Sequence, residues 1–101
     1  MANINVTWTN PADLSDINQV KVYRKDGDHS ALDLTDTTNG ETFRTGATLL
    51  ETVLTANLTA GGTNSYTDSG VTNGSYTYAA FSENDGGFGP GDQNDSPVVV
   101  S

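Results

Sequence analysis

The sequence contains no cysteine and a single histidine, His29. The absence of cysteine excludes disulfide bonds, thiolate catalysis and cysteine-ligated zinc. One histidine excludes a metal site built from several histidines, and it leaves His29 as the sole base for a serine–histidine–aspartate site. His29 stands between Asp28 and Ser30 in a polar loop. Since adjacent residues seldom reach the geometry of a catalytic relay, we predict an ordinary loop histidine.

Basic residues are scarce, with 4 Lys and Arg against 13 Asp and Glu, so the net charge is −9. A field of this sign repels phosphate, which makes nucleic acids and anionic membranes poor partners. No apolar run approaches the length of a membrane span, and the first residues show neither the basic nor the apolar region of a secretion signal. We therefore expect a protein made in the cytoplasm, with no signal peptide and no membrane insertion.

The acidic residues follow no catalytic or metal-binding pattern. Asp26, Asp28, Asp33 and Asp36 are close in sequence, but Ala31 stands where an EF-hand calcium loop needs glycine, and no glutamate closes the loop. Paired carboxylates for glycoside hydrolysis need a cleft that raises the pKa of one acid, whereas nearly all acids here lie in predicted turns. We predict no enzymatic activity, no metal site and no cofactor.

The length of 101 residues fits a single domain over residues 1–101. Serine, threonine and asparagine make up about a third of the chain, which is typical of strands joined by turns. Ile4, Val6 and Trp8 alternate with polar residues and predict a strand over residues 4–9. Residues 17–25 predict a second strand. These patterns favour an all-β domain.

Further strands are predicted at residues 65–67, before a turn at 68–70, and at residues 74–81 and 98–100. Residues 49–58 predict a strand and a turn, with a single helical turn as the alternative. Residues 26–48 are polar and long for a structureless connection, so we expect a short hairpin or a functional loop there.

Several segments in this order resemble a fibronectin type III domain, an immunoglobulin-like β-sandwich. The resemblance places strand B at residues 6–11, strand C at 20–24, strand E with its turn at 65–71 and strand F at 74–81. It continues through residues 84–89 and covers nearly the whole chain from Ile4 onward. It implies that Tyr76 is a corner tyrosine whose hydroxyl bonds a nearby backbone carbonyl. The expected core and structural residues are Trp8, Val20, Val22, Tyr66, Tyr76 and Tyr78.

Two features depart from the family pattern. The usual strand A is missing, because strand B begins almost at Met1, and residues 26–48 form an insertion between strands C and C′. A missing strand A leaves strand B as an unpaired edge, which is a template for another strand. We expect this edge to be covered by the insertion, by the C-terminus or by a strand from a neighbouring molecule.

Aromatic residues gather on the predicted outer face of the sheet formed by strands C, F and G. Alternation places Tyr23 and Phe81 there, with Phe88 nearby and Phe43 in the insertion. Exposed rings can anchor a protein interface. The alternative is scattered surface rings without a role. These four residues are the candidate interface.

Fibronectin-like domains are widespread in phage virions, so the resemblance implies a non-enzymatic structural protein of a virus particle. We expect a capsid decoration protein or a tail-associated protein, located in the virion, that contacts a viral capsid or tail protein and self-associates around a symmetry axis. One alternative is a carbohydrate-binding or adhesion module in which Tyr23, Phe81 or Phe88 stacks on a cell-surface glycan. Another is a spacer module of a larger bacterial extracellular protein.

Overall fold

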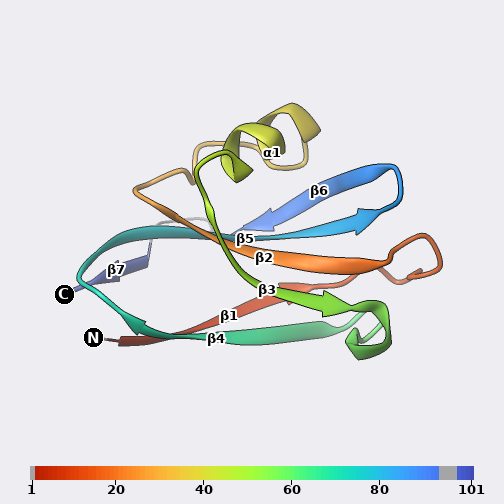
Figure 1. The fold of residues 1–101 in the computed structure, drawn as a ribbon, viewed down its shortest axis with the longest axis horizontal. Helices are drawn as coiled ribbons and strands as arrows, with labels where there is room; N and C mark the ends of the chain where they lie inside the picture. The colour runs from red at the N-terminus through yellow and green to blue at the C-terminus, as the bar shows by residue number, and fades with distance from the viewer. Residues whose placement is uncertain (1, 94–97) are drawn as a thin grey trace.

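The computed structural model describes residues 2–93 and 98–101. Within this part the chain forms seven strands, one α-helix and one short 3-10 helix (Figure 1). In chain order the elements are β1 (Ala2–Thr9), β2 (Gln19–Asp26), α1 (Thr37–Arg44), β3 (Thr48–Leu54), η1 (Thr55–Asn57), β4 (Thr63–Val71), β5 (Gly74–Asn84), β6 (Gly87–Gln93) and β7 (Val98–Val100).

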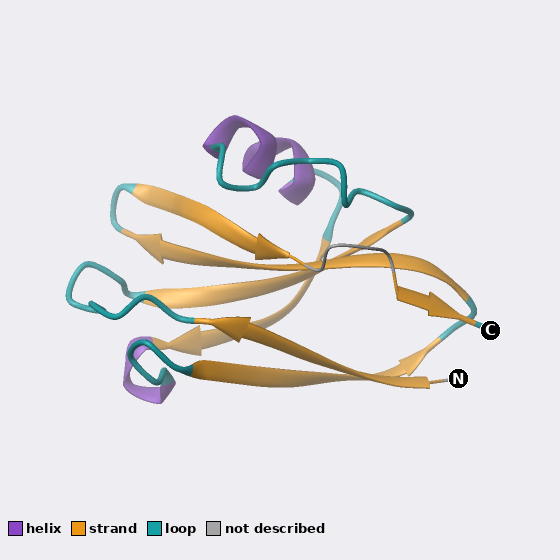
Figure 2. Ribbon diagram, turned by 180° about the vertical axis from the view of Figure 1, so that it is seen from behind, coloured by secondary structure: helices purple, strands orange, loops and turns teal. Residues whose placement is uncertain are grey.

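The strands form two antiparallel sheets of unequal width. Among the described residues β1 pairs only with β4, whereas the wider sheet has the order β3-β2-β5-β6, with β7 pairing β5 beyond the end of β6. The two-stranded sheet lies along one face of the wider sheet, and α1 lies on the opposite face (Figures 1 and 2). The fold is therefore mostly β, in two packed sheets, as the composition and alternation predicted.

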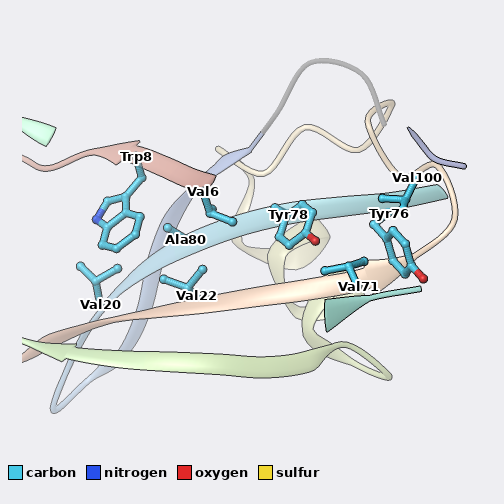
Figure 3. Close-up of a cluster of buried hydrophobic side chains, with 9 residues drawn as sticks. All are labelled: Val6, Trp8, Val20, Val22, Val71, Tyr76, Tyr78, Ala80 and Val100. Atoms are coloured by element: carbon cyan, nitrogen blue, oxygen red, sulfur yellow. The ribbon is translucent and has the colours of Figure 1, made fainter. Parts of the chain in front are cut away.

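The main core lies between the two sheets (Figure 3). Alternation along each strand directs every second side chain inward, so Val6 and Trp8 of β1 contact residues from β2 and β5. Tyr66 of β4 is only partly buried and packs against this cluster. The buried members are Val6, Trp8, Val20, Val22, Val71, Tyr76, Tyr78, Ala80 and Val100.

Tyr76 lies at one end of this core, near the connection between β4 and β5. Its hydroxyl donates a hydrogen bond of 2.8 Å to the backbone carbonyl of Thr72. This is the contact expected of a corner tyrosine, because the ring is buried while the hydroxyl satisfies a carbonyl in the preceding turn.

The insertion forms a helix, so the prediction of a hairpin or loop over residues 26–48 was wrong. The side chain of Asp36 caps α1 by accepting a hydrogen bond of 2.8 Å from the Thr38 backbone. Phe43, in the last turn, is fully buried. A helix of eight residues with one large apolar side chain has little stability of its own, so burial of Phe43 against the sheet stabilises α1.

Two local predictions change in the second half of the chain. The turn predicted at residues 68–70 does not form, because β4 continues to Val71 and Asp68 pairs with Ile4 of β1. Residues 49–58 contain both of the alternatives considered, since β3 is followed directly by the single helical turn η1.

Candidate functional site

The aromatic residues predicted to form an exposed face are covered by the insertion. Phe81 and Phe43 have no exposed surface, and Tyr23 is buried beside them. Phe88 is partly buried against the same cluster. Tyr23 and Phe81 lie on the outer face of the wider sheet, as predicted. The prediction that they are exposed to solvent was wrong, because the insertion folds back over the outer face of β2 and β5. We call Tyr23, Leu34, Phe43, Ala79 and Phe81 the second core.

Ring contacts explain why this cluster is closed. Phe81 meets Tyr23 edge to face at a centroid distance of 5.9 Å, and it meets Phe88 in the same way at 6.2 Å. The guanidinium of Arg44, at the end of α1, lies 3.7 Å from the centroid of the Phe88 ring. This cation–π contact holds the helix end over the ring. The cluster therefore acts as a core, in which Tyr23, Phe43 and Phe81 are buried and Phe88 is partly buried.

The acidic residues of the insertion stabilise turns. Asp28 accepts hydrogen bonds from the backbone and hydroxyl of Ser30, and Asp33 does the same with Thr35. These hydrogen bonds lower the pKa of both carboxyl groups, because they favour the charged form. Over residues 2–93 and 98–101 no group of three or more histidine, aspartate or glutamate side chains is placed to hold a metal ion.

His29 is part of the packing between the insertion and the sheet. Its backbone N–H donates to the Thr77 hydroxyl at 2.9 Å, and that hydroxyl donates to the carbonyl of Gly27 at 2.9 Å. The imidazole Nε2 lies 2.9 Å from the carbonyl oxygen of Asp26, and the ring meets Phe43 edge to face. These contacts fix the start of the insertion on β5.

A buried polar cluster links the two sheets. The carboxylate of Asp68 on β4 accepts hydrogen bonds of 2.9 Å from Arg24 of β2 and from the hydroxyl of Tyr78 on β5. Burial raises the pKa of Tyr78 above its ordinary value, and the bond to the Asp68 carboxylate adds to this rise. Sequence reasoning missed this cluster because Asp68-Ser69-Gly70 has the composition of a turn.

The edge of β1 that faces away from β4 pairs with no strand of the described residues. Neither the insertion nor β7 supplies one, because α1 packs on the outer face of the wider sheet and β7 pairs β5. β1 has the sequence ANINVTWT and carries no charged residue. Natural edge strands are commonly protected by charge, proline or a bulge. The one irregularity in β1 lies between Ala2 and Ile4, so residues 4–8 form a regular, uncharged stretch of the strand.

Two adjoining hollows lie beside this edge and together form what we call the open-edge groove. The first, of about 280 Å³, is lined by Trp8 and Pro11 on one side and by Val20, Ala80 and Ser82 on the other. The second, of about 380 Å³, shares Pro11 and Ser82 with the first. The groove therefore lies between the end of β1, the connection from β1 to β2, and β5, and it meets β1 only at Trp8 and Thr9.

The side chain of Asn10 holds Trp8 in place beside the groove through hydrogen bonds. The indole N–H of Trp8 donates to the side-chain oxygen of Asn10 at 2.8 Å. The amide of Asn10 donates in turn to the carbonyl of Thr59 at 3.0 Å. Asn10 is buried, so these bonds satisfy its polar atoms and fix the position of the Trp8 ring.

The far end of the groove is acidic. The second hollow is lined by Asp13, Asp16 and Glu83. Glu83 forms an ion pair of 3.3 Å with Lys21, whereas no cation of the described residues pairs with Asp13 or Asp16. Hydrogen bonds from Ser15 lower the pKa of Asp13, which therefore stays charged near neutral pH.

Comparison with known protein families, with curated proteins and with solved structures finds no match to this chain. Among the described residues, no helix has the length and apolar character needed to cross a membrane.

Proposed function

We propose that this chain is a non-enzymatic structural protein of a virus particle, either a capsid decoration protein or a tail-associated protein, that acts by protein–protein contact. The observation that carries the proposal is the regular, uncharged stretch of β1 over residues 4–8, whose outer side pairs with no strand of the described residues. Such an edge is a ready site for contact with another chain.

Features of the fibronectin type III pattern support the class of domain. The order β3-β2-β5-β6 opposite β1-β4 corresponds to strands C′, C, F and G opposite strands B and E, and no strand of the described residues takes the place of strand A. The hydrogen bond from Tyr76 to Thr72 fits the corner tyrosine of this class. Domains of this kind occur in phage virions, where they act by contact with shell or tail proteins.

The aromatic residues that the sequence suggested as the interface are not the contact surface in this proposal. Tyr23, Phe43 and Phe81 belong to the second core, and the Arg44 guanidinium stacks on Phe88. This arrangement also takes away the aromatic platform on which a sugar-binding module would depend. The spacer alternative is favoured by no particular contact. The proposed contact surface is therefore the edge of β1 and the open-edge groove.

Detection of the chain in purified particles tests this function. Virus particles are purified by density-gradient centrifugation from cultures in which the gene for this chain is present. The proteins of the particles are then quantified by mass spectrometry. We expect the chain to sediment with the particles in a fixed ratio to a capsid or tail protein. Recovery of the chain in the soluble fraction alone, with no peptides from it in the particles, contradicts the proposal.

A further inference from the structure

We infer that Asn73 is a site of spontaneous modification, at which the chain converts its own asparagine into aspartate or isoaspartate with water as the only co-reactant. This inference goes beyond the proposed contact function and does not depend on it. Asparagine is among the thermally labile residues. It is most labile before glycine, because glycine has no β-carbon to shield its backbone nitrogen from the preceding side chain. The sequence has two such pairs, Asn39-Gly40 and Asn73-Gly74.

The reaction joins two groups that are adjacent in the chain. The backbone nitrogen of Gly74 loses its proton and attacks the side-chain carbonyl carbon of Asn73, the C–N bond of that amide breaks, and ammonia leaves with the proton. The product is a cyclic imide. Water that adds at the side-chain carbonyl restores the ordinary peptide bond and gives aspartate, whereas water that adds at the main-chain carbonyl gives isoaspartate. Only water enters and only ammonia leaves, so the conversion needs no oxidant or reductant.

The connection between β4 and β5 leaves Asn73 free to react. It consists of Thr72 and Asn73, which are both exposed, and it crosses from the two-stranded sheet to the wider sheet. Within residues 2–93 and 98–101, the Asn73 side chain forms no hydrogen bond that would hold it away from the backbone. Gly74 is exposed as well, and it pairs with Val100 of β7, a strand of three residues. Local opening of so short a pairing costs little free energy.

The glycine of this pair is required by the fold. Gly74 has a φ of +155°, and a β-carbon at this position would lie 3.2 Å from the hydroxyl oxygen of Tyr76. That hydroxyl donates to the carbonyl of Thr72, which is the corner contact described above. A larger residue at position 74 would press on the Tyr76 hydroxyl, so the corner retains the residue that makes Asn73 reactive.

Helix α1 protects the other asparagine–glycine pair. The N–H of Gly40 donates to the carbonyl of Asp36 at 3.0 Å, and the side-chain amide of Asn39 donates to the carbonyl of Asp33 at 3.1 Å. Gly40 is buried, and Phe43 fixes the helix on the sheet. Attack by the Gly40 nitrogen therefore requires α1 to open first. Because the free energy of opening adds to the barrier, Asn39 should convert at least about tenfold more slowly than Asn73.

Isoaspartate at position 73 changes the corner itself. The main chain then runs through the former side-chain carbon, so it becomes longer between Thr72 and Gly74, and it gains a negative charge. The Thr72 carbonyl is the acceptor of the Tyr76 hydroxyl, and the Tyr76 ring is buried. Since a buried hydroxyl depends on its acceptor, the converted chain should melt at a lower temperature than the unconverted chain.

Timed incubation followed by peptide mass spectrometry tests this inference. The full chain is kept at neutral pH and physiological temperature, and samples are digested with pepsin in acid, where further conversion is slow. The mass of each peptide reports loss of the amide, and fragmentation separates isoaspartate from aspartate. We expect conversion at Asn73 with isoaspartate among the products, and conversion at Asn39 at least about tenfold slower.

Two matched variants assign the signal. Asn73→Gln adds one methylene group, which disfavours closure of the imide ring, and it should remove most of the conversion. Asn39→Gln makes the same change in α1 and should leave the total conversion unchanged. The fall in melting temperature during incubation should be absent from the Asn73→Gln chain and present in the Asn39→Gln chain.

Incubation in concentrated urea separates the effect of the fold from that of the sequence. Both pairs follow a threonine, as Thr38-Asn39-Gly40 and Thr72-Asn73-Gly74. Once the chain is unfolded, the two asparagines should convert at rates within about threefold of each other, because α1 no longer restrains Asn39.

Three results would overturn the inference. They are equal conversion of Asn39 and Asn73 in the folded chain, protection of Asn73 in the folded chain relative to the unfolded chain by about tenfold or more, and a difference between the two sites that persists in urea. The first two show that the β4–β5 connection does not favour the reaction, and the third assigns the difference to sequence rather than to the fold. The measurements use the isolated chain, so none of them bears on whether it sediments with virus particles.

Discussion

Asp68 is the only buried aspartate or glutamate among the described residues, with 5% of its surface exposed. Its carboxylate receives hydrogen bonds from Arg24 and Tyr78. A buried charge is tolerated only when it is paired and hydrogen-bonded, so this residue ties β4 to β2 and β5 more specifically than the apolar contacts around it.

We expect Asp68→Asn to lower the free energy of unfolding by about 2–4 kcal/mol, because it leaves the Arg24 guanidinium without its carboxylate. Urea denaturation measures the change. Asp26→Asn is the matched control, since Asp26 is exposed and the substitution removes the same charge; its effect should stay within about 0.5 kcal/mol. Equal effects of the two variants would mean that the buried pair does not contribute to stability.

The buried hydroxyl of Tyr78 should make the free energy of unfolding depend on pH in the alkaline range. The folded state raises the pKa of Tyr78, so folded chains keep a proton that unfolded chains lose above pH about 10. The stabilisation is fully present below that pH and is lost as the pH rises. Tyr78→Phe should therefore show a weaker fall in unfolding free energy between pH 9 and pH 11 than the unaltered chain, measured by urea denaturation. Parallel pH profiles for the two proteins would contradict this assignment.

At the scale of the elements, the strands were largely predictable and the helix was not. Ile4, Val6 and Trp8 alternate clearly enough to give both the strand and its inner face. Helix α1 has one large apolar side chain in eight residues, so its stability comes from contacts distant in sequence, which no local pattern reveals. The same contacts explain why Phe81 was assigned to the correct face but expected in solvent.

Phe43 is the residue on which the attachment of α1 depends. We expect Phe43→Ala to lower the free energy of unfolding by about 3–5 kcal/mol, because the ring is fully buried and its removal leaves a cavity beside Phe81. Leu54→Ala, at a side chain that is 56% exposed, is the control and should change stability by about 0.5 kcal/mol or less. If both variants unfold at the same urea concentration, the insertion is not held by this ring.

The candidate site was predictable only in part. The resemblance predicted an unpaired edge at the first strand, and no strand of the described residues pairs with the outer side of β1. The groove beside it was not predictable, because Pro11, Ala80 and Asp16 are brought together by pairing and loop geometry rather than by spacing in the sequence. The alternation of apolar and polar residues shows which side of a strand is buried. The position of a hollow depends instead on how the two sheets and their connecting loops pack together.

For the molecule as a whole, the net charge of −9 on 101 residues is the dominant long-range effect. Only three ion pairs link described side chains, so most carboxylates repel one another through solvent. Added salt screens this repulsion, because the Debye length falls from about 30 Å at 0.01 M to about 8 Å at 0.15 M.

We therefore expect the melting temperature to rise by about 4–8 °C between low and physiological ionic strength, which corresponds to about 1 kcal/mol for a domain of this size. Circular dichroism melts in sodium chloride measure the shift. Sodium sulfate at equal ionic strength is the control and should give a similar shift in this dilute range. A melting temperature that does not change, or that falls, would show that self-repulsion does not limit stability.

The six consecutive buried residues of β5, from Tyr76 to Phe81, have a consequence for how the chain finds its native alignment. A strand with one polar side rejects a slip of one residue, since the slip would expose its apolar side chains. β5 is apolar on both sides and has no such safeguard. Two polar anchors discriminate instead: Thr77 bonds Gly27 and His29 on one side of the sheet, and Tyr78 bonds Asp68 on the other. A slipped β5 would bury both hydroxyls without partners. The hydroxyl oxygens of Thr77 and Tyr78 therefore select the native alignment of the strand.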